Sequence, residues 1–183
     1  MLETLITSKT RVKLLLKFFL NPETRAYLRE LASEFGESTN AIRVELNRLT
    51  EAKLLEKGSN GRTVMYNANT GHSLFKDIQS VVKKYIGIDT LAEELVGKLG
   101  DVQAAYVIGD YAKGIDSGLI DLILVGEVDE EKLKEMTVKT EGLINRKIRT
   151  LVLKRSDLEK LDKRLDLKHS LFIWSKADAR KKR

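Results

Sequence analysis

The sequence of 183 residues contains no cysteine and a single proline. Without thiols there is no disulfide framework, no zinc site built on thiolates and no cysteine nucleophile. Apolar runs such as residues 14–16 and 171–174 fall far short of the roughly 20 residues that a membrane-spanning helix needs. The first residues also lack the basic and apolar regions of a secretory signal. We therefore expect a cytoplasmic protein without a membrane partner.

The positive charge of the chain is unevenly distributed. The 33 Lys and Arg residues exceed the 27 Asp and Glu residues by six, and five of these six excess charges lie in residues 1–86. The remainder of the excess lies in a basic tail over 177–183, while residues 87–176 are slightly acidic. We expect two domains, over 1–86 and 87–176, of which the first has an anionic partner.

The first half has the element order of a winged helix-turn-helix. Apolar periodicity predicts helices over 2–20, 27–35 and 39–52, followed by strands over 54–57 and 63–67. Gly36 suits the end of the second helix, and Ser38 suits the N-cap of the third. Residues 58–62 form a basic hairpin tip that joins the two strands. Three helices followed by a hairpin are typical of DNA-binding winged helices.

Three segments within about residues 6–69 carry a family resemblance: TSKTRVKLLLKFFLNP, YLRELASEFGESTNAIRVELNRLTEAKLLEK and GRTVMYNAN. They resemble winged-helix regulators of the arsenical-resistance repressor type. The resemblance implies binding to double-stranded DNA as a homodimer, with the helix after the wing packed on a second subunit. An apolar stripe suits that helix: Leu74, Ile78, Val81, Val82 and Tyr85. With no cysteine and only two histidines, His72 and His169, metal sensing is not expected.

The third predicted helix supplies the candidate DNA contacts. The N-terminal residues of a recognition helix reach base edges and phosphates in the major groove. The candidates are Ser38, Thr39, Asn40, Arg43 and Asn47 on this helix, with Arg62 at the hairpin tip. Arg43 is the expected base reader, because a guanidinium can donate two hydrogen bonds to guanine. The alternative is an ordinary solvated helix face.

The second half alternates strands and helices, which predicts a mixed α/β sheet domain. The predicted strands cover 102–108, 120–125 and 147–153, and the predicted helices cover 129–142 and 156–167. A further helix is expected to start at Asp89 or Thr90 and to run to Lys98, after a hinge over 87–89. Residues 171–174 are expected in a core or an interface. The whole chain is thus expected to be a two-domain α+β and α/β protein.

The segment GDYAKGIDSGLIDL, residues 109–122, resembles the signature of the nucleotidyltransferase superfamily. In that signature a Gly-Ser pair opens a helix, and an Asp-x-Asp pair follows on a strand. The helix N-terminus can hold a triphosphate, and the two carboxylates can share divalent metal ions. The matching positions are Gly109, Tyr111, Ala112, Lys113, Gly114, Asp121, Leu122 and Gly126. The resemblance implies a remnant nucleotide-binding loop made of Gly109, Asp110, Lys113, Gly114 and Asp121.

The departures from this signature predict a domain without catalysis. Asp110 stands where the signature has serine, and Leu119 stands where it has the first metal-binding aspartate. On the third strand, Arg149 or Thr150 occupies the place of another carboxylate. We therefore expect no catalytic residues, no metal site and no cofactor. A rescue in which Asp110, Asp116 and Asp121 hold one cation stays open as an alternative.

The sequence thus favours a DNA-binding transcriptional regulator with a pseudoenzyme domain that serves dimerisation or senses a small-molecule or nucleotide effector. A competing hypothesis is a Mg-dependent nucleotidyltransferase whose winged helix recruits the substrate. A third is an antitoxin-like interaction module. Leu119, in place of a metal-binding aspartate, separates the first hypothesis from the second.

Overall fold

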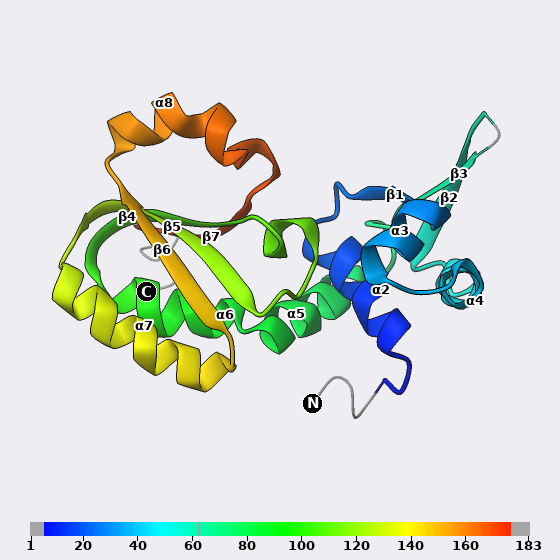
Figure 1. Ribbon diagram of the computed structural model, residues 1–183, viewed down its shortest axis with the longest axis horizontal. Helices are drawn as coiled ribbons and strands as arrows, with labels where there is room; N and C mark the ends of the chain where they lie inside the picture. Colours follow the sequence, from blue (N-terminus) through cyan, green and yellow to red (C-terminus); the bar gives the residue numbers. More distant parts are fainter. Residues whose placement is uncertain (1–5, 62, 177–183) are drawn as a thin grey trace. The chain divides into compact units, whose positions relative to one another are not determined.

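The structure is a computed structural model that describes residues 6–61 and 63–176. The chain divides between Tyr85 and Ile86 into two compact units, and each is described here by itself (Figure 1). Both units combine helices with a sheet, so the expected mixed α+β class is confirmed. Within the described residues, no helix is long and apolar enough to cross a membrane.

The first unit opens with three helices and one short strand. They are α2 (Lys9–Leu20), β1 (Arg25–Tyr27), α3 (Leu28–Phe35) and α4 (Thr39–Glu51). Residues 2–5 of the expected first helix lie outside the described residues, and residues 6–8 are not helical, because the Ser8 side chain accepts a hydrogen bond from the Arg11 N–H and caps the helix there. At the end of α3, Gly36 adopts the expected left-handed conformation with φ +65°.

The wing follows α4 as an antiparallel hairpin. Strand β2 (Leu55–Asn60) pairs with β3 (Thr63–Ala68), and β1 adds to the other side of β3, which gives the order β1-β3-β2. Both hairpin strands run longer than expected. Helix, strand, two helices and a two-stranded wing form a winged helix-turn-helix, as predicted. The unit then ends in α5 (Phe75–Ile86).

Aromatic and aliphatic side chains from all the helices fill the core of this unit. Phe18 and Phe19 of α2 are fully buried, as are Ile42 and Leu46 of α4. The Phe19 ring stacks on the Phe75 ring of α5 with 5.4 Å between their centroids. The helix after the wing is therefore anchored in the first unit through Phe75. Leu74, just before this helix, and Val81 on it are exposed.

The second unit begins with one continuous helical segment of changing pitch. It comprises α6 (Ile88–Thr90), a π-helical turn (Leu91–Leu95) and a 3₁₀ turn (Val96–Lys98). The expectation that Asp89 or Thr90 caps this segment is wrong, because Gly87 holds the cap position with φ +81°. A Cβ atom at Gly87 would lie 2.5 Å from Cγ2 of Ile144, so both the conformation and the space require glycine.

A mixed four-stranded sheet forms the centre of this unit. Its strands are β4 (Gly100–Ile108), β5 (Leu119–Val128), β6 (Lys147–Leu153) and β7 (Leu171–Ser175), in the order β6-β5-β4-β7. β5 and β6 run parallel, joined by α7 (Glu130–Ile144), while β4 pairs antiparallel with β5 and with β7. The mixed α/β sheet is thus confirmed, and residues 171–174 form its second edge.

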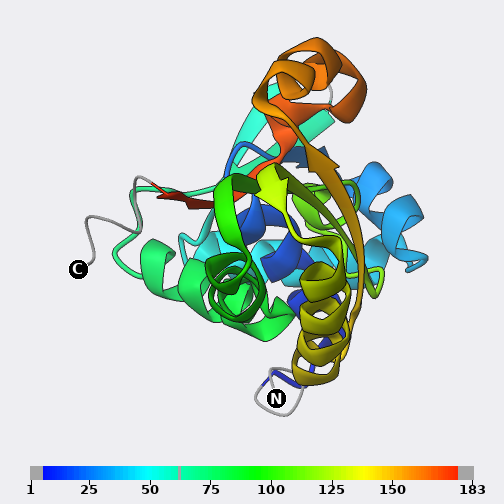
Figure 2. The ribbon, with the colours of Figure 1, turned by 90° about the vertical axis from the view of Figure 1, so that its left-hand side faces the viewer.

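Helices cover both faces of this sheet (Figure 1, Figure 2). α7 and the segment 88–98 lie on one face, and α8 (Arg155–Leu165) lies on the other. α8 ends two residues earlier than expected, because Asp166 takes a left-handed conformation with φ +50°. Glycine is required once more at Gly126, where φ is +140° and a Cβ atom would lie 2.2 Å from the Asp101 carbonyl oxygen.

Thr140 of α7 is fully buried, and its hydroxyl finds no hydrogen-bond partner among the described residues. A buried polar group without a partner loses its hydration and gains nothing in return. We expect Thr140→Val to raise the free energy of unfolding by about 1 kcal/mol, because valine keeps the shape and removes the hydroxyl. Urea denaturation measures the change. The matched control Thr137→Val alters a partly exposed threonine of the same helix, and an equal gain there would contradict the explanation.

Candidate functional site

α4 presents one face to the core and another to solvent. Ile42, Leu46 and Leu49 are buried, whereas Arg43 and Asn47 are exposed one helical turn apart. Among the described residues Arg43 forms no ion pair, so its guanidinium is available to a ligand. Packing of the apolar stripe therefore sets the outward direction of the polar one.

The start of α4 places three further candidates on the same solvent side. The Ser38 side chain accepts a hydrogen bond from the Ala41 N–H at 3.1 Å, which confirms the predicted N-cap. Thr39 and Asn40 follow in the first turn and are exposed. The positive end of the helix dipole is thus exposed at this end of α4. Arg62, the remaining candidate, lies outside the described residues.

Residues of α3, α4 and the wing line a surface hollow of about 520 Å³. Its lining combines candidates and new residues: Tyr27, Leu28, Arg29, Arg43, Asn47, Thr63, Val64 and Tyr66. Sequence reasoning missed Arg29, which is exposed in the first turn of α3. The available signal was a cation at the start of the helix that precedes a predicted recognition helix. Arg29 and Arg43 give this hollow a positive lining.

Glu45 fixes the position of α4. Its buried carboxylate accepts hydrogen bonds from Arg11 of α2 at 2.8 Å and from Arg48 at 3.0 Å. Burial alone would raise the pKa of Glu45, but the hydrogen bond and charge of Arg11, together with Arg48, hold the pKa below its ordinary value. The ionised carboxylate thus ties α4 to α2 at neutral pH.

The second candidate site is the loop between β4 and β5. Gly109 leaves β4 with φ +70°, and a Cβ atom there would lie 2.8 Å from the Asp121 carboxylate. The loop then forms one 3₁₀ turn (Tyr111–Lys113) that Gly114 ends with φ +77°. The signature implies a helix at this point, and the structure has this single turn instead. Asp110 and Lys113 are exposed on the turn.

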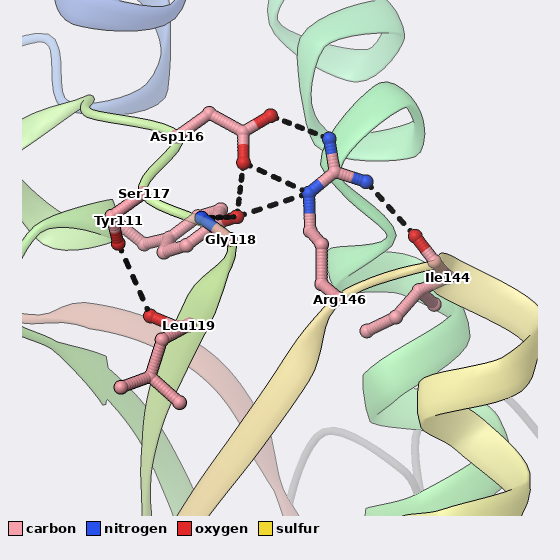
Figure 3. A network of polar contacts seen from close by, with 7 residues as sticks. All are labelled: Tyr111, Asp116, Ser117, Gly118, Leu119, Ile144 and Arg146. Atoms are coloured by element: carbon pink, nitrogen blue, oxygen red, sulfur yellow. Dashed lines mark hydrogen bonds and ion pairs between the residues drawn. The ribbon is translucent and has the colours of Figure 1, made fainter.

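Arg146 closes this loop from the start of β6 (Figure 3). Its guanidinium donates to both carboxylate oxygens of Asp116, at 3.0 and 2.6 Å, and to the Tyr111 hydroxyl at 3.0 Å. The Tyr111 hydroxyl donates in turn to Asp116 and accepts the Gly118 N–H at 3.2 Å. Arg146 also donates to the Ile144 carbonyl oxygen at 3.0 Å. The loop is therefore locked by one shared network.

Burial and neighbouring charges shift the pKa values of all three side chains in this network. Burial and the neighbouring Asp116 raise the pKa of Tyr111 well above its ordinary value. Burial opposes ionisation of Asp116, but the hydrogen bonds from Arg146 and Tyr111 outweigh it and lower the Asp116 pKa. Burial likewise works against the charge of Arg146, but Asp116 raises the Arg146 pKa. At neutral pH the network thus holds a carboxylate, a guanidinium and a neutral phenol.

Asp121, the surviving signature carboxylate, is paired with a cation. In the parallel register of β5 and β6, Asp121 lies opposite Arg149, and Nε of Arg149 donates to Asp121 at 2.5 Å. Thr150 lies opposite Leu122, so its side chain points to the other face of the sheet. Of the two possible equivalents of the third carboxylate, Arg149 is therefore the one beside Asp121. The hydrogen bond and charge of Asp121 raise the pKa of Arg149.

This donor set does not fit a two-metal clamp. The three relevant positions hold one carboxylate, the aliphatic Leu119 and the guanidinium of Arg149, whereas magnesium requires oxygen ligands. The structure also does not bring Asp110, Asp116 and Asp121 together around one position. Asp116 and Asp121 each face their own arginine, and in the described part of the chain no three acidic or histidine side chains gather to hold a metal.

Comparisons with known proteins add slight structural likenesses. No protein-family model and no curated protein matches the chain. The reduced form of HlyU from Vibrio cholerae shares 18% identity over 45% of this chain and 82% of its own, with a TM-score of 0.36. AF1382 from Archaeoglobus fulgidus shares 17% sequence identity over 46% of this chain and 96% of its own, with a TM-score of 0.37. A candidate nucleotidyltransferase from Sulfolobus solfataricus shares 20% sequence identity over 54% of this chain and 89% of its own, with a TM-score of 0.34.

The network at Asp116 predicts a pH-dependent loss of stability. Because the folded state lowers the pKa of Asp116, its contribution is present above the unfolded pKa of about 3.9 and is lost as the pH falls through the folded value. We expect Asp116→Asn to lower the free energy of unfolding by about 1–3 kcal/mol at neutral pH. The gap to the wild type should close below about pH 4.

Urea denaturation across this pH range measures the gap. The control Asp110→Asn removes an exposed carboxylate from the same loop, and we expect it to stay near wild-type stability at neutral pH. A gap for Asp116→Asn that persists unchanged into acid would contradict the electrostatic explanation.

Proposed function

We propose that the protein is a DNA-binding transcriptional regulator that acts as a homodimer, and that its second unit keeps a nucleotidyltransferase-like fold without catalysis. The observation that carries the first part is the exposed face of α4, where Arg43 and Asn47 stand beside Arg29 around one hollow. A recognition helix with an arginine and an amide on its outer face suits the major groove. The excess of five positive charges in residues 1–86 adds long-range attraction to phosphate.

The residues of this surface divide by the contacts they are suited to make. Arg43 and Asn47 are suited to base edges, because a guanidinium pairs with guanine and an amide pairs with adenine. Ser38 and Thr39, at the first turn of α4, and Arg29, at the first turn of α3, are suited to phosphate oxygens. Arg62 at the wing tip belongs to the same proposal through the sequence. A homodimer would present two such surfaces to a two-fold symmetric site.

The proposal for the second unit rests on the pairing of Asp121 with Arg149. Catalysis in the superfamily that the loop resembles requires carboxylates that bind metal ions, and here the one remaining carboxylate is neutralised by a guanidinium 2.5 Å away. Lys147 lies opposite Leu119, so the neighbouring position on β6 is basic as well. These charges support a structural or sensing role for the unit in place of magnesium-dependent nucleotidyl transfer.

Arg43→Ala tests the DNA-binding surface. We expect it to weaken binding to duplexes selected from a randomised pool by about 10- to 100-fold, since a bidentate contact to guanine contributes about 1–3 kcal/mol. Fluorescence anisotropy with duplexes of about 30 base pairs, long enough for two half-sites one helical turn apart, measures the affinity. Lys113→Ala, which removes an exposed cation from the second unit, is the matched control. Unchanged affinity for Arg43→Ala would sink the assignment.

Arg29→Ala serves as a second variant of this surface. If Arg29 contacts phosphate, its loss weakens binding to selected and unselected duplexes alike and reduces the slope of log affinity against log salt by about one. A loss confined to the selected duplexes would instead place Arg29 at a base edge. Arg43→Ala is expected to weaken binding mainly to the selected duplexes, so this comparison distinguishes the roles of the two arginines.

Restoring the missing carboxylates tests the second unit. Residues 119 and 121 lie on the same face of β5, and residue 149 lies opposite 121, so Leu119→Asp combined with Arg149→Asp places three carboxylates together. We expect the double variant to bind Mn²⁺ in an electron paramagnetic resonance titration and the wild type to bind none at this position. The control Leu119→Asp with Arg149 retained should bind more weakly. Magnesium-dependent nucleotide incorporation by the wild type would overturn the proposal.

A further inference from the structure

Strand β6 forms one edge of the four-stranded sheet, and its outer side carries backbone groups that β5 does not reach. The Lys147 N–H donates to the Gly118 carbonyl at 2.8 Å, so Lys147 and every second residue after it direct their backbone groups toward β5. Ile148, Thr150 and Val152 therefore direct theirs outward. The Glu141 carboxylate accepts the outward Ile148 N–H at 2.8 Å.

The part of the edge that Glu141 leaves open is short and apolar. Among the described residues, the outward backbone groups of Thr150 and Val152 pair with no strand. Leu151 is 41% exposed and Val152 is 36% exposed. Edge strands in monomeric proteins are usually protected by charge, proline or a bulge. Residues 150–152 contain none of these protective features.

Beside this edge, α7 lines a hollow of about 490 Å³. Its side chains come from one stripe of the helix and meet Thr150 and Val152 of β6: Glu130, Leu133, Lys134, Thr137, Val138 and Glu141. Val138, near the middle of the stripe, is 70% exposed. Lys134 lies to one side of Val138 and Glu141 to the other, so the stripe carries opposite charges about an apolar centre.

We propose that the β6 edge pairs antiparallel with the β6 edge of a second copy of this chain, across a two-fold axis at Leu151. In this register Thr150 exchanges two backbone hydrogen bonds with Val152 of the second copy, and Val152 does the same with Thr150. All the open groups of the two residues are then satisfied, and the bond from Ile148 to Glu141 stays intact. Leu151 meets Leu151 of the second copy as a directly opposed pair.

The same axis explains the arrangement of α7. Thr137 and Val138 share the hollow with Thr150 and Val152, so a two-fold axis at Leu151 passes close to the middle of the helix stripe. The two α7 helices then run antiparallel, and Lys134 of one copy lies across from Glu141 of the other, a carboxylate that already pairs with Lys147 of its own chain at 2.8 Å. The surface is thus complementary to itself in backbone pairing and in apolar contact, which favours a second copy as the occupant.

This inference rests on the homodimer of the proposed function and assigns an interface to it. The competing interface is α5 with the residue that precedes it: Leu74 is 52% exposed and Val81 is 46% exposed. The two interfaces use different units of the chain and are separable by substitution. The measurements that follow are made without DNA, so a failure of DNA binding leaves them unaffected.

Disulfide cross-linking tests the register, and the absence of native cysteine makes every single variant unambiguous. Directly opposed residues that are not hydrogen-bonded have Cα atoms about 4.5 Å apart, within reach of a disulfide. We expect Leu151→Cys to form a covalent dimer under mild oxidation. Leu153→Cys should not, because the register separates the two copies of that residue by about 14 Å. Cross-linking of Leu153→Cys in preference to Leu151→Cys would overturn the register.

Sedimentation of the full chain tests the interface itself. We expect the wild type to sediment as a dimer, and Leu151→Lys to raise the dimer dissociation constant by at least about tenfold, because two lysines would oppose each other on the axis. Val81→Lys on α5 and Leu143→Lys on α7, outside the lining of the hollow, should leave the dimer intact. Thermal melting monitors folding of each variant.

Three outcomes would overturn the proposal: a dimer that persists in Leu151→Lys, a dimer lost only in Val81→Lys, or a wild type that stays monomeric at every soluble concentration. A monomeric Leu151→Lys that still binds a single half-site would support the interface and show that it is separate from the DNA-binding surface.

Discussion

Arginines that neutralise buried or half-buried carboxylates determine the geometry of the second unit. Arg146 holds Asp116 and Tyr111 in one network, and Arg149 holds Asp121 across the strand register. Arg146 directly precedes β6 and Arg149 lies on it, and both partners lie on or beside the loop that resembles a phosphate-binding signature. The loop conformation and the single 3₁₀ turn are thus stabilised from within the protein. A bound nucleotide or metal ion is not needed to neutralise these charges.

In the first unit, the outward surface follows from inward packing. The buried stripe of Ile42, Leu46 and Leu49 fixes the rotation of α4 about its axis, and the pair of Glu45 with Arg11 fixes α4 against α2. Arg43 and Asn47 are then directed to solvent by helical periodicity. The hollow that they share with Arg29 exists because α3 and the wing are packed against the same core. The proposed DNA contacts and the packing contacts therefore lie on different sides of one helix.

Although it does not predict strands β1 and β7, the sequence predicts the type and order of most described elements, because apolar periodicity and capping residues are local signals. The Ser38 cap and the Gly36 terminus illustrate this. Prediction from the sequence fails where contacts between residues far apart in the chain determine the local structure. The cap at Gly87 depends on Ile144, which is far along the chain, and the pairing of Asp121 with Arg149 depends on strand register. Arg29 was missed for the same reason, since only the fold brings it to the hollow of α4.

Glu141 has a consequence for the solubility of the chain. An uncovered edge strand can recruit further strands without limit, which leads to fibrous aggregation. By occupying the N–H of Ile148, the Glu141 carboxylate shortens the open edge to three residues. The proposed pairing centred on Leu151 uses these residues on both copies, so no further strand can add at the β6 edge. A glutamate on a helix thus limits how far a neighbouring sheet can grow.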